Sequence, residues 1–190
     1  MCARRSNPER TAATRRALTG TARRLFVEQG YPATTLAAIT RAAGVTTGAL
    51  YHHWSGKEAL LAAVVHDVYA DLARRIATRT QAGSPPVDRL LLAGDEFLAA
   101  CVDPRVARLI LLDAPAALGY ERWSEIDERW WLAPTAALVR EAAPQPITAN
   151  RSRLLAVALL GCLTTLGREA ATAPAEVAAA YAAVVRAVLA

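Results

Sequence analysis

Apolar residues recur every three or four positions along most of the chain, which is the spacing of an amphipathic α-helix. Leu18, Ala22 and Leu25 form one such face in a first helix that starts near Asn7 and ends at Gly30. No segment has the sustained alternation of β-branched residues that would indicate a strand. The pattern predicts an all-α fold of about nine helices. The later ones are expected near residues 56–80, 87–101, 104–112, 119–142, 149–171 and 174–189.

Residues 34–57 predict two short helices joined by a tight turn. Thr34 or Thr35 provides the N-cap of the first helix, and Gly44 stands where a helix can end in a left-handed residue. Thr46 can cap the second helix. Two helices joined by a short turn that contains glycine form a helix-turn-helix, whose second helix lies in the major groove of DNA. Helical hairpins also occur in proteins that never touch DNA, so the turn alone does not decide the function.

The residues around this turn resemble the DNA-binding domain of TetR-type transcriptional regulators. That family's pattern runs Thr-x-x-x-Ile-Ala-x-x-Ala-Gly-Val-Ser-x-Gly-x-Leu-Tyr-x-His-Phe-x-x-Lys-Glu-x-Leu, and the resemblance covers roughly residues 10–65. Thr40 replaces the usual Ala, Trp54 replaces the usual Phe, and Ala37 occupies a site where some relatives carry a base-reading side chain. The stretch DAPAALGYERWSEID, residues 113–127, also resembles a subgroup of the family. The positions that match the DNA-binding pattern are Thr35, Ile39, Ala43, Gly44, Val45, Thr46, Gly48, Leu50, Tyr51, His53, Lys57, Glu58 and Leu60.

The resemblance implies which side chains hold the DNA backbone. Lys57 stands at the start of the next helix, where free N–H groups and the helix dipole already favour an anion, so a phosphate contact is its natural role. Thr35, Tyr51 and His52 occupy further backbone-binding positions. For His53, a DNA contact and a packing role are equally compatible with the resemblance.

Base readout is expected from Thr46, Thr47 and Gly48, through hydroxyl groups and close backbone approach. The segment 46–53 contains no Arg, Asn or Gln, the side chains that form bidentate pairs with guanine or adenine. Phosphate binding and DNA shape are therefore expected to supply a large share of the affinity.

Positive charge is concentrated in the first third of the chain. Residues 1–60 contain nine basic and three acidic side chains, whereas the remainder contains thirteen basic and fourteen acidic ones. This asymmetry is expected of a basic DNA-binding lobe joined to a neutral domain, although a solvated Arg-rich surface would give the same count. Arg4, Arg5 and Arg10 are candidates to reach a minor groove or a phosphate, and solvated arms are an equal alternative for the first two.

Length and turn signals suggest two domains. A chain of 190 residues that is 54% hydrophobic can bury a substantial core. Ser55 to Glu58 has capping-box spacing for a long helix over residues 56–80, and Gly83-Ser84-Pro85-Pro86 then breaks the pattern. We assign residues 1–55 to a DNA-binding domain and residues 56–190 to an effector-binding and dimerisation domain, with the helix over residues 56–80 bridging them.

Several classes of protein are disfavoured by what the sequence lacks. The start, MCARRSNPER, has no apolar signal segment, and the uncharged run over residues 154–167 is too short to span a bilayer. Three scattered cysteines fit a reducing compartment, so we expect a cytoplasmic protein without a membrane partner. Without Cys-x-x-Cys, His-Glu-x-x-His or a phosphate-binding glycine loop, we expect no catalytic site, metal or cofactor. An all-α enzyme is the weakest alternative.

Aromatic residues gather in the middle of the chain. Tyr120, Trp123, Trp130 and Trp131 lie within twelve residues, a composition typical of a small-ligand site but also of a packed core. Both interpretations stay open, and a ligand for such a pocket would be small and apolar or amphipathic. The other candidate lining residues are Phe97, Cys101, Leu112 and Thr164, with Asp95, Glu96, Asp113 and Arg168 as candidate polar contacts.

The last two predicted helices suggest a dimer surface. Val177, Tyr181, Val184 and Val188 follow one another at spacings of four, three and four, as in a coiled-coil stripe, and Gly161 allows close helix approach. We expect a homodimer formed by these helices, because one recognition helix reads only a few base pairs. Intrachain core is the alternative.

The TetR resemblance implies a regulatory function. It predicts a repressor that a small-molecule effector releases from a palindromic double-stranded DNA operator. The effector would move the helix over residues 56–80 and misalign the two recognition helices. The alternative is a ligand-independent or architectural DNA-binding protein of the same fold, in which the aromatic cluster is only core.

Overall fold

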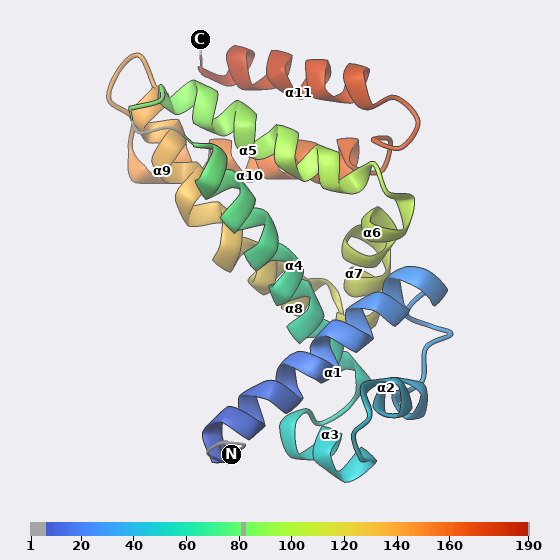
Figure 1. Cartoon of the computed structure of the whole chain (residues 1–190). Helices are drawn as coiled ribbons and strands as arrows, with labels where there is room; N and C mark the ends of the chain where they lie inside the picture. The colour runs from blue at the N-terminus through green and yellow to red at the C-terminus, as the bar shows by residue number, and fades with distance from the viewer. Residues whose placement is uncertain (1–6, 81–82, 190) are drawn as a thin grey trace.

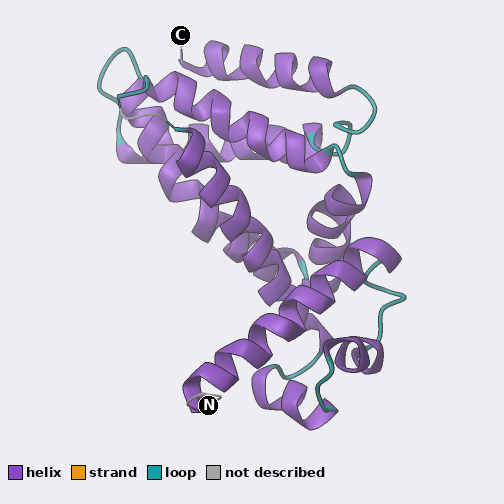
Figure 2. Ribbon diagram, in the orientation of Figure 1, coloured by secondary structure: helices purple, strands orange, loops and turns teal. Residues whose placement is uncertain are grey.

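The structure, a computed structural model, describes residues 7–80 and 83–189. Figure 2 shows that every regular element in these ranges is a helix, which confirms the predicted all-α fold. Counted as continuous runs, the described residues form nine helical segments. One group of three lies at one end of the molecule, and the fourth helix runs from that group to a larger helical body (Figure 1). No helix in the described part of the chain is long and apolar enough to cross a membrane.

The bounds of the helices follow the predicted ones closely in the first half of the chain. That half contains α1 (Asn7–Gln29), α2 (Leu36–Ala43), α3 (Thr47–His53), α4 (Lys57–Arg79) and α5 (Pro86–Cys101). The second half contains α6 (Pro104–Arg108), the π-helix η1 (Leu109–Asp113), α7 (Ala114–Leu118), α8 (Tyr120–Asp127), the π-helix η2 (Glu128–Leu132), α9 (Ala133–Ala142), α10 (Ala149–Leu166) and α11 (Pro174–Leu189).

The predicted bounds are wrong in two places. The helix expected to end near residue 112 passes through η1 and continues to Leu118, because η1 adds a π-helical turn instead of ending the run. The helix expected to reach residue 171 ends at Leu166 and is followed by turns. A hydrophobic pattern does not distinguish α from π hydrogen bonding, because it records which residues are apolar and not which backbone groups pair.

The helix-turn-helix is held by the caps that its sequence predicts. The Thr35 hydroxyl accepts a hydrogen bond from the backbone N–H of Ala38 at 3.1 Å, and the Thr46 hydroxyl caps α3 in the same way. Gly44, at φ 66°, takes the left-handed conformation that ends α2. Thr34, the alternative cap, is buried and its hydroxyl donates to a backbone carbonyl instead.

The long helix α4 is stabilised by burial and not by its predicted cap. Its N-cap is Gly56, without a side-chain hydrogen bond, so the capping box expected from Ser55 and Glu58 does not form. The helix packs against α1 near its start and against α5, α7 and α8 further along. Its buried apolar residues are Leu60, Leu61, Ala62, Val64, Val65, Val68, Tyr69 and Leu72.

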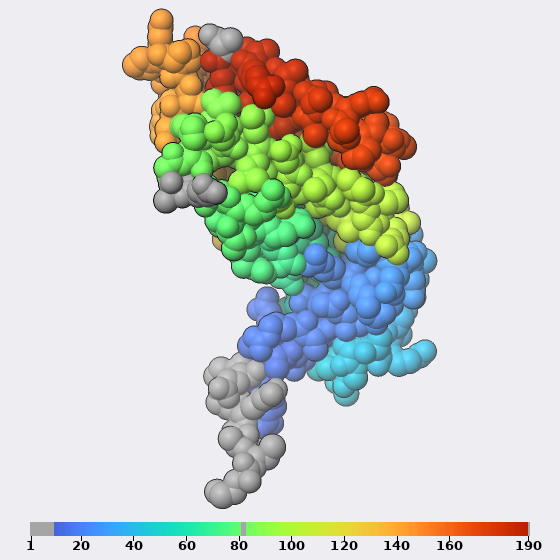
Figure 3. All heavy atoms as spheres, turned by 45° about the horizontal axis from the view of Figure 1, so that its top comes forward, coloured from blue at the N-terminus to red at the C-terminus, as the bar shows by residue number. Residues whose placement is uncertain are grey.

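The C-terminal helix packs on its own subunit through the stripe that was predicted to face a partner. Figure 3 shows α11 lying along α5, with α1 extending away from this body. Tyr181 and Val177 are only 2% and 5% exposed, and the Tyr181 ring lies against Gly94 of α5. The prediction that these two residues form the dimer interface is therefore wrong. An apolar stripe has the same spacing whether its own chain or a second chain covers it.

We predict that Gly94→Ala destabilises the protein by about 1–3 kcal/mol, because the added methyl group has no room beside the Tyr181 ring. Thermal or urea unfolding, followed by circular dichroism, measures the change. Gly20→Ala is the matched control, since a methyl group there meets nothing within 4 Å. We expect that control to be neutral or more stable by up to about 1 kcal/mol, as alanine favours a helix over glycine. Equal stability of the two variants would contradict the tight packing of α11 on α5.

Candidate nucleic-acid interface and ligand cavity

The second helix of the helix-turn-helix presents an uncovered face at the end of the molecule opposite α11 (Figure 1). Thr47, Gly48 and His52 are exposed, and Tyr51 is 56% exposed. Leu50, on the opposite side, is fully buried. The apolar side of α3 is therefore anchored in the core, and its polar side is available to a groove of DNA.

His53 and Trp54 lie where this helix meets the rest of the unit. Trp54 is buried, with the Arg15 guanidinium over its ring at 5.4 Å, so this departure from the family pattern is accommodated by packing. His53 is half-buried and stacks edge-to-face with Trp54. Burial, followed by the nearby His52 and Arg15, lowers the pKa of His53 below its ordinary value. These contacts support a packing role for His53.

Lys57 joins the start of α4 to the loop between α1 and α2. Its ammonium donates to the carbonyl oxygen of Pro32 at 3.3 Å and lies 4.2 Å from the centre of the Tyr31 ring. Burial lowers the pKa of this ammonium, while the charge of Asp113 acts in the opposite direction. Lys57 thus orders the base of the helix-turn-helix, whether or not it also meets a phosphate.

A second set of contacts ties the same loop to η1. Asp113 accepts a hydrogen bond from the backbone N–H of Tyr31 at 3.2 Å and pairs with Arg108 at 3.5 Å. Arg108 in turn donates to the carbonyl oxygen of Phe26 at the end of α1. We call Tyr31, Lys57, Arg108 and Asp113 the junction. Sequence reasoning missed it and assigned Asp113 to a ligand pocket instead.

The remaining positions of the family pattern differ in their exposure to solvent. Thr35 is exposed beside α2, where its hydroxyl already serves as the helix cap. Thr40 is buried, which accommodates the second departure from the family pattern, and Ala37 is exposed without a polar group. Arg4 and Arg5 lie outside the described residues.

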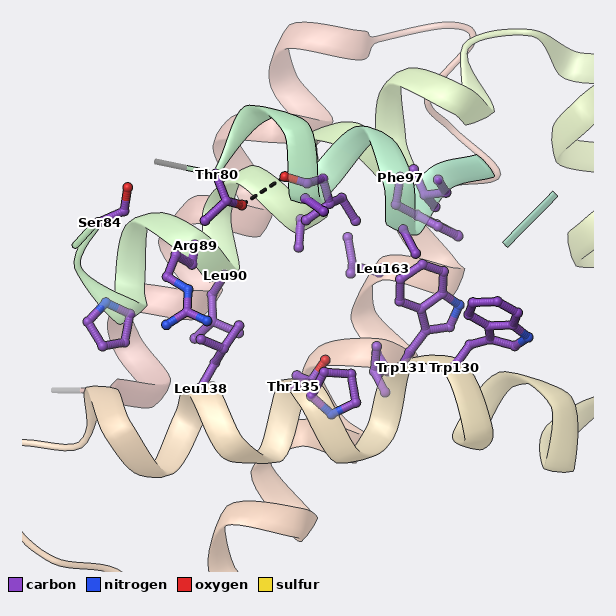
Figure 4. A pocket seen from close by; sticks show the side chains of 18 of the residues that line it. Thr80, Ser84, Arg89, Leu90, Phe97, Trp130, Trp131, Thr135, Leu138 and Leu163 are labelled. Carbon is purple, nitrogen blue, oxygen red and sulfur yellow. Dashed lines mark hydrogen bonds between the residues drawn. The ribbon is translucent and has the colours of Figure 1, made fainter. Parts of the chain in front are cut away.

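A cavity of about 930 Å³ opens between the helices of the C-terminal body (Figure 4). Its size is within the range of small-molecule sites. Four of the eight residues predicted to line a pocket lie in its wall, namely Phe97, Trp130, Trp131 and Thr164. The last two turns of α4 form another part of the wall through Leu72, Ala73, Ile76 and Ala77.

The other predicted lining residues lie elsewhere. Trp123 and Cys101 are buried core residues, and the Trp123 indole donates to the carbonyl oxygen of Ile110 at 3.2 Å. Leu112 and Tyr120 are 50% and 75% exposed. The prediction failed for these positions because sequence composition does not distinguish an aromatic or apolar residue of a cavity wall from one in a packed core or on the surface. Of the candidate polar contacts, Glu96 is buried beside Arg75 and Arg79, and neither it nor Asp95, Asp113 or Arg168 is part of the wall.

The charged groups of the wall lie at two places. Arg89 pairs with Glu141 at 3.3 Å, and Figure 4 shows Arg89 near Ser84, on the side of the cavity away from Trp130 and Trp131. Asp127 belongs to the wall as well and accepts a hydrogen bond from the Tyr69 hydroxyl at 3.0 Å. Burial raises the pKa of Asp127 above its ordinary value, an effect that the Tyr69 hydrogen bond only partly offsets.

The two indoles have different hydrogen bonding. Trp130 donates to His66 Nδ1 at 2.8 Å, and burial lowers the pKa of that histidine, which favours its neutral form. The Trp131 N–H is buried and has no acceptor among the described residues, while its ring meets Tyr69 edge-to-face at 5.4 Å. Sequence reasoning found both indoles but missed Asp127, although this residue ends the stretch that resembles a TetR subgroup.

The outer faces of α10 and α11 carry small and apolar residues. Leu154 and Val157 are 55% and 44% exposed, and Gly161 is exposed one turn further on. Val184 and Val188 are half-buried against the core. The exposed alanines of α11 are Ala175, Ala179, Ala180, Ala183 and Ala187. In the described part of the chain, no group of His, Cys, Asp and Glu side chains could hold a metal ion.

Comparisons with known proteins agree with this arrangement. The family described as "Bacterial regulatory proteins, tetR family" matches residues 18–64, and "Tetracyclin repressor-like, C-terminal domain" matches residues 87–190. The HTH-type transcriptional repressor Rv1474c of Mycobacterium tuberculosis is 32% identical over 131 residues, which cover 68% of this chain and 67% of that protein. The repressor DhaR of Mycobacterium sp. strain GP1 is 40% identical over 35% of this chain and 34% of its own.

A solved structure extends the likeness to the whole fold. A TetR-family transcriptional regulator from Pectobacterium atrosepticum is 28% identical, with a TM-score of 0.67, over 96% of this chain and 93% of its own. Both family descriptions, the helix-turn-helix and the helical second domain lead to one conclusion. The chain belongs to the TetR family of DNA-binding transcriptional regulators.

Proposed function

We propose that this regulator is a repressor that binds a two-fold symmetric operator as a homodimer and leaves it when a small molecule enters the cavity. The observation that carries the proposal is the position of α4. Three residues separate it from the exposed recognition helix α3, and its last two turns line the cavity. One helix therefore joins the DNA-facing surface to the proposed effector site.

DNA binding would use the exposed side of α3. Thr47 and Gly48 are available to the edges of bases, and Tyr51 and His52 to phosphates. Lys57 donates to Pro32, but an ammonium group carries three N–H donors, so it can also meet a phosphate. Because α3 has no side chain that makes bidentate base pairs, backbone contacts and DNA shape would supply much of the affinity.

Dimerisation would use the outer faces of α10 and α11. The exposed Leu154 and Val157, with small residues beside them, would let two helix pairs approach closely in a four-helix arrangement. Among the five residues expected at the interface, Gly161 remains the one that is exposed. Two-fold symmetry would then place two copies of α3 on successive major grooves, about one helical turn of DNA apart.

Release would follow from a displacement of α4. A helix of 23 residues is about 34 Å long, so a small tilt at the cavity becomes a shift of several ångströms at its other end. The junction would transmit the same change, since Asp113 and Lys57 both contact the loop that precedes α2. The ligand would act only through its higher affinity for the conformation that does not fit the operator.

We predict that selection from a random DNA library recovers a two-fold symmetric site.

We predict that Lys57→Ala weakens binding to every DNA sequence by a similar factor. The slope of log affinity against log salt should fall in magnitude by about 0.9 for each phosphate that the variant no longer neutralises. Fluorescence anisotropy at several salt concentrations measures the slope. Arg140→Ala, at an exposed position of α9, should leave it unchanged. An unaltered slope in Lys57→Ala, with folding retained, would show that Lys57 does not contact a DNA phosphate.

We predict that Val157→Arg converts the dimer to a monomer, because two guanidinium groups would meet near the symmetry axis. Sedimentation velocity measures the change. Leu112→Arg is the control, since Leu112 is similarly exposed but lies on η1, away from the proposed interface. A dimer that persists in Val157→Arg, or that dissociates in the control, would place the interface elsewhere.

We predict that Ala93→Phe, which fills part of the cavity, abolishes the response to any compound that releases the parent protein from its operator. Operator binding without the compound should be retained. Releasing compounds can be found by screening a small-molecule library against the protein–operator complex by anisotropy. Ala99→Phe, on an exposed position of the same helix, is the matched control. Full response in Ala93→Phe would locate the effector outside this cavity.

A further inference from the structure

The cavity contains a carboxyl group that the protein does not pair with a cation. Asp127 accepts one hydrogen bond, from Tyr69, and within residues 7–80 and 83–189 no ion pair involves it. The acid is half-buried and Tyr69 beside it is 1% exposed. A carboxylate removed from water without a cation is costly, and its ordinary fates are protonation or a bound partner.

Two other acids that are shielded from water, Glu96 and Asp113, form ion pairs with arginines. Glu96, which is 5% exposed, lies against the guanidinium groups of Arg75 and Arg79. Asp113 pairs with Arg108. Both of these carboxylates therefore have an arginine beside them, whereas Asp127 has no ion pair among the described residues. It is also the acid that faces the cavity at the indole end.

Aromatic residues share the cavity wall with this carboxyl group. Asp127, Trp130 and Trp131 belong to one continuous helical run, and all three lie in the wall of the cavity. Tyr69 joins them, because its ring contacts Trp131 and its hydroxyl contacts Asp127. Indole faces attract cations through their quadrupole, and this attraction is strongest where water is excluded. A carboxylate beside two indoles is suited to a desolvated ammonium group.

The rest of the wall indicates the polarity and charge of the remainder of the ligand. Leu72, Ile76, Leu90, Leu138 and Leu163 supply apolar surface between the indoles and the far end. At that end Arg89 is already neutralised by Glu141, so it offers no free positive charge to an acidic ligand. The charged lining residues sum to one negative charge, from Asp127.

We propose that the effector of this regulator is a cationic amphiphile, with a protonated or quaternary amine held by Asp127 and the faces of Trp130 and Trp131. Its apolar or aromatic body extends along the leucine-lined wall toward Arg89. This inference rests on the proposed function, in which the cavity is the effector site, and adds the chemical class of the ligand.

The test uses ligands that differ only in charge. Three apolar bodies (phenylbutyl, phenylhexyl and naphthylethyl) each carry an ammonium, a hydroxyl or a carboxylate head. Binding of all nine compounds to the free dimer, without DNA, is measured by calorimetry up to about 1 mM. We expect at least one ammonium compound to bind about tenfold more tightly than its alcohol, as a charge-assisted hydrogen bond allows. Each carboxylate should bind more weakly than its alcohol.

Two matched variants locate the origin of the preference. Asp127→Asn keeps an oxygen that can accept from Tyr69, and it should reduce the ammonium preference to within about twofold. Glu141→Gln removes one negative charge from the other end of the same cavity and should retain the preference. Thermal unfolding of both variants identifies any loss of fold. If Asp127→Asn does not fold, the ranking of the three head groups on the parent protein decides alone.

The proposal is overturned if no ammonium compound binds more tightly than its alcohol, which includes the absence of binding by all nine. It is also overturned if the preference survives in folded Asp127→Asn. Release from DNA is measured separately. Ammonium compounds that bind through Asp127 without releasing the operator would contradict the proposed function alone. A neutral or acidic compound that releases the operator through the cavity, while amines fail to bind, would contradict this inference alone.

Discussion

The burial of α4 along its length is the constraint on which the rest of the structure depends. Its apolar stripe packs first on α1, within the helix-turn-helix unit, and then on α5, α7 and α8. Because these contacts are continuous, neither end of the helix can move far without changing the packing at the other. In the proposed function, α4 would therefore couple the recognition surface to the cavity, although they lie in different regions of the sequence.

Hydrogen bonds and charges refine this connection at the junction. The loop before α2 is held from two directions, by Lys57 of α4 and by Asp113 of η1. Gly30, at φ 88°, adopts a left-handed conformation there and brings the backbone close to Arg108. Lys57 of α4 and Asp113 of η1 thus contact the same loop, so in the proposed function a change in either element would reach α2 and α3.

The two π-helical stretches matter for the same reason. η1 ends at Asp113, which bonds the loop, and η2 carries the two indoles of the cavity wall. A π-turn changes the angular position of every residue that follows, and such turns often occur at functional sites. Both departures from regular helix thus place a side chain that the proposed mechanism uses.

The sequence by itself determined the helical class, the cap at Thr46, the left-handed Gly44 and the family, and it narrowed the cap of α2 to Thr34 or Thr35. These features depend on residues close together in the chain, and local hydrogen bonding and backbone sterics decide them. Only the tertiary structure decided which chain covers each apolar face and which acids have a cation beside them. Val177 and Tyr181 have the spacing of a dimer stripe but are covered by their own subunit, and Tyr120 is exposed although Trp130 and Trp131 line a cavity. Periodicity identifies the buried side of a helix but not its partner, because many packed arrangements bury the same stripe. The exceptional position of Asp127 emerged in the same way, since an unpaired carboxyl group is defined by what lies around it in space.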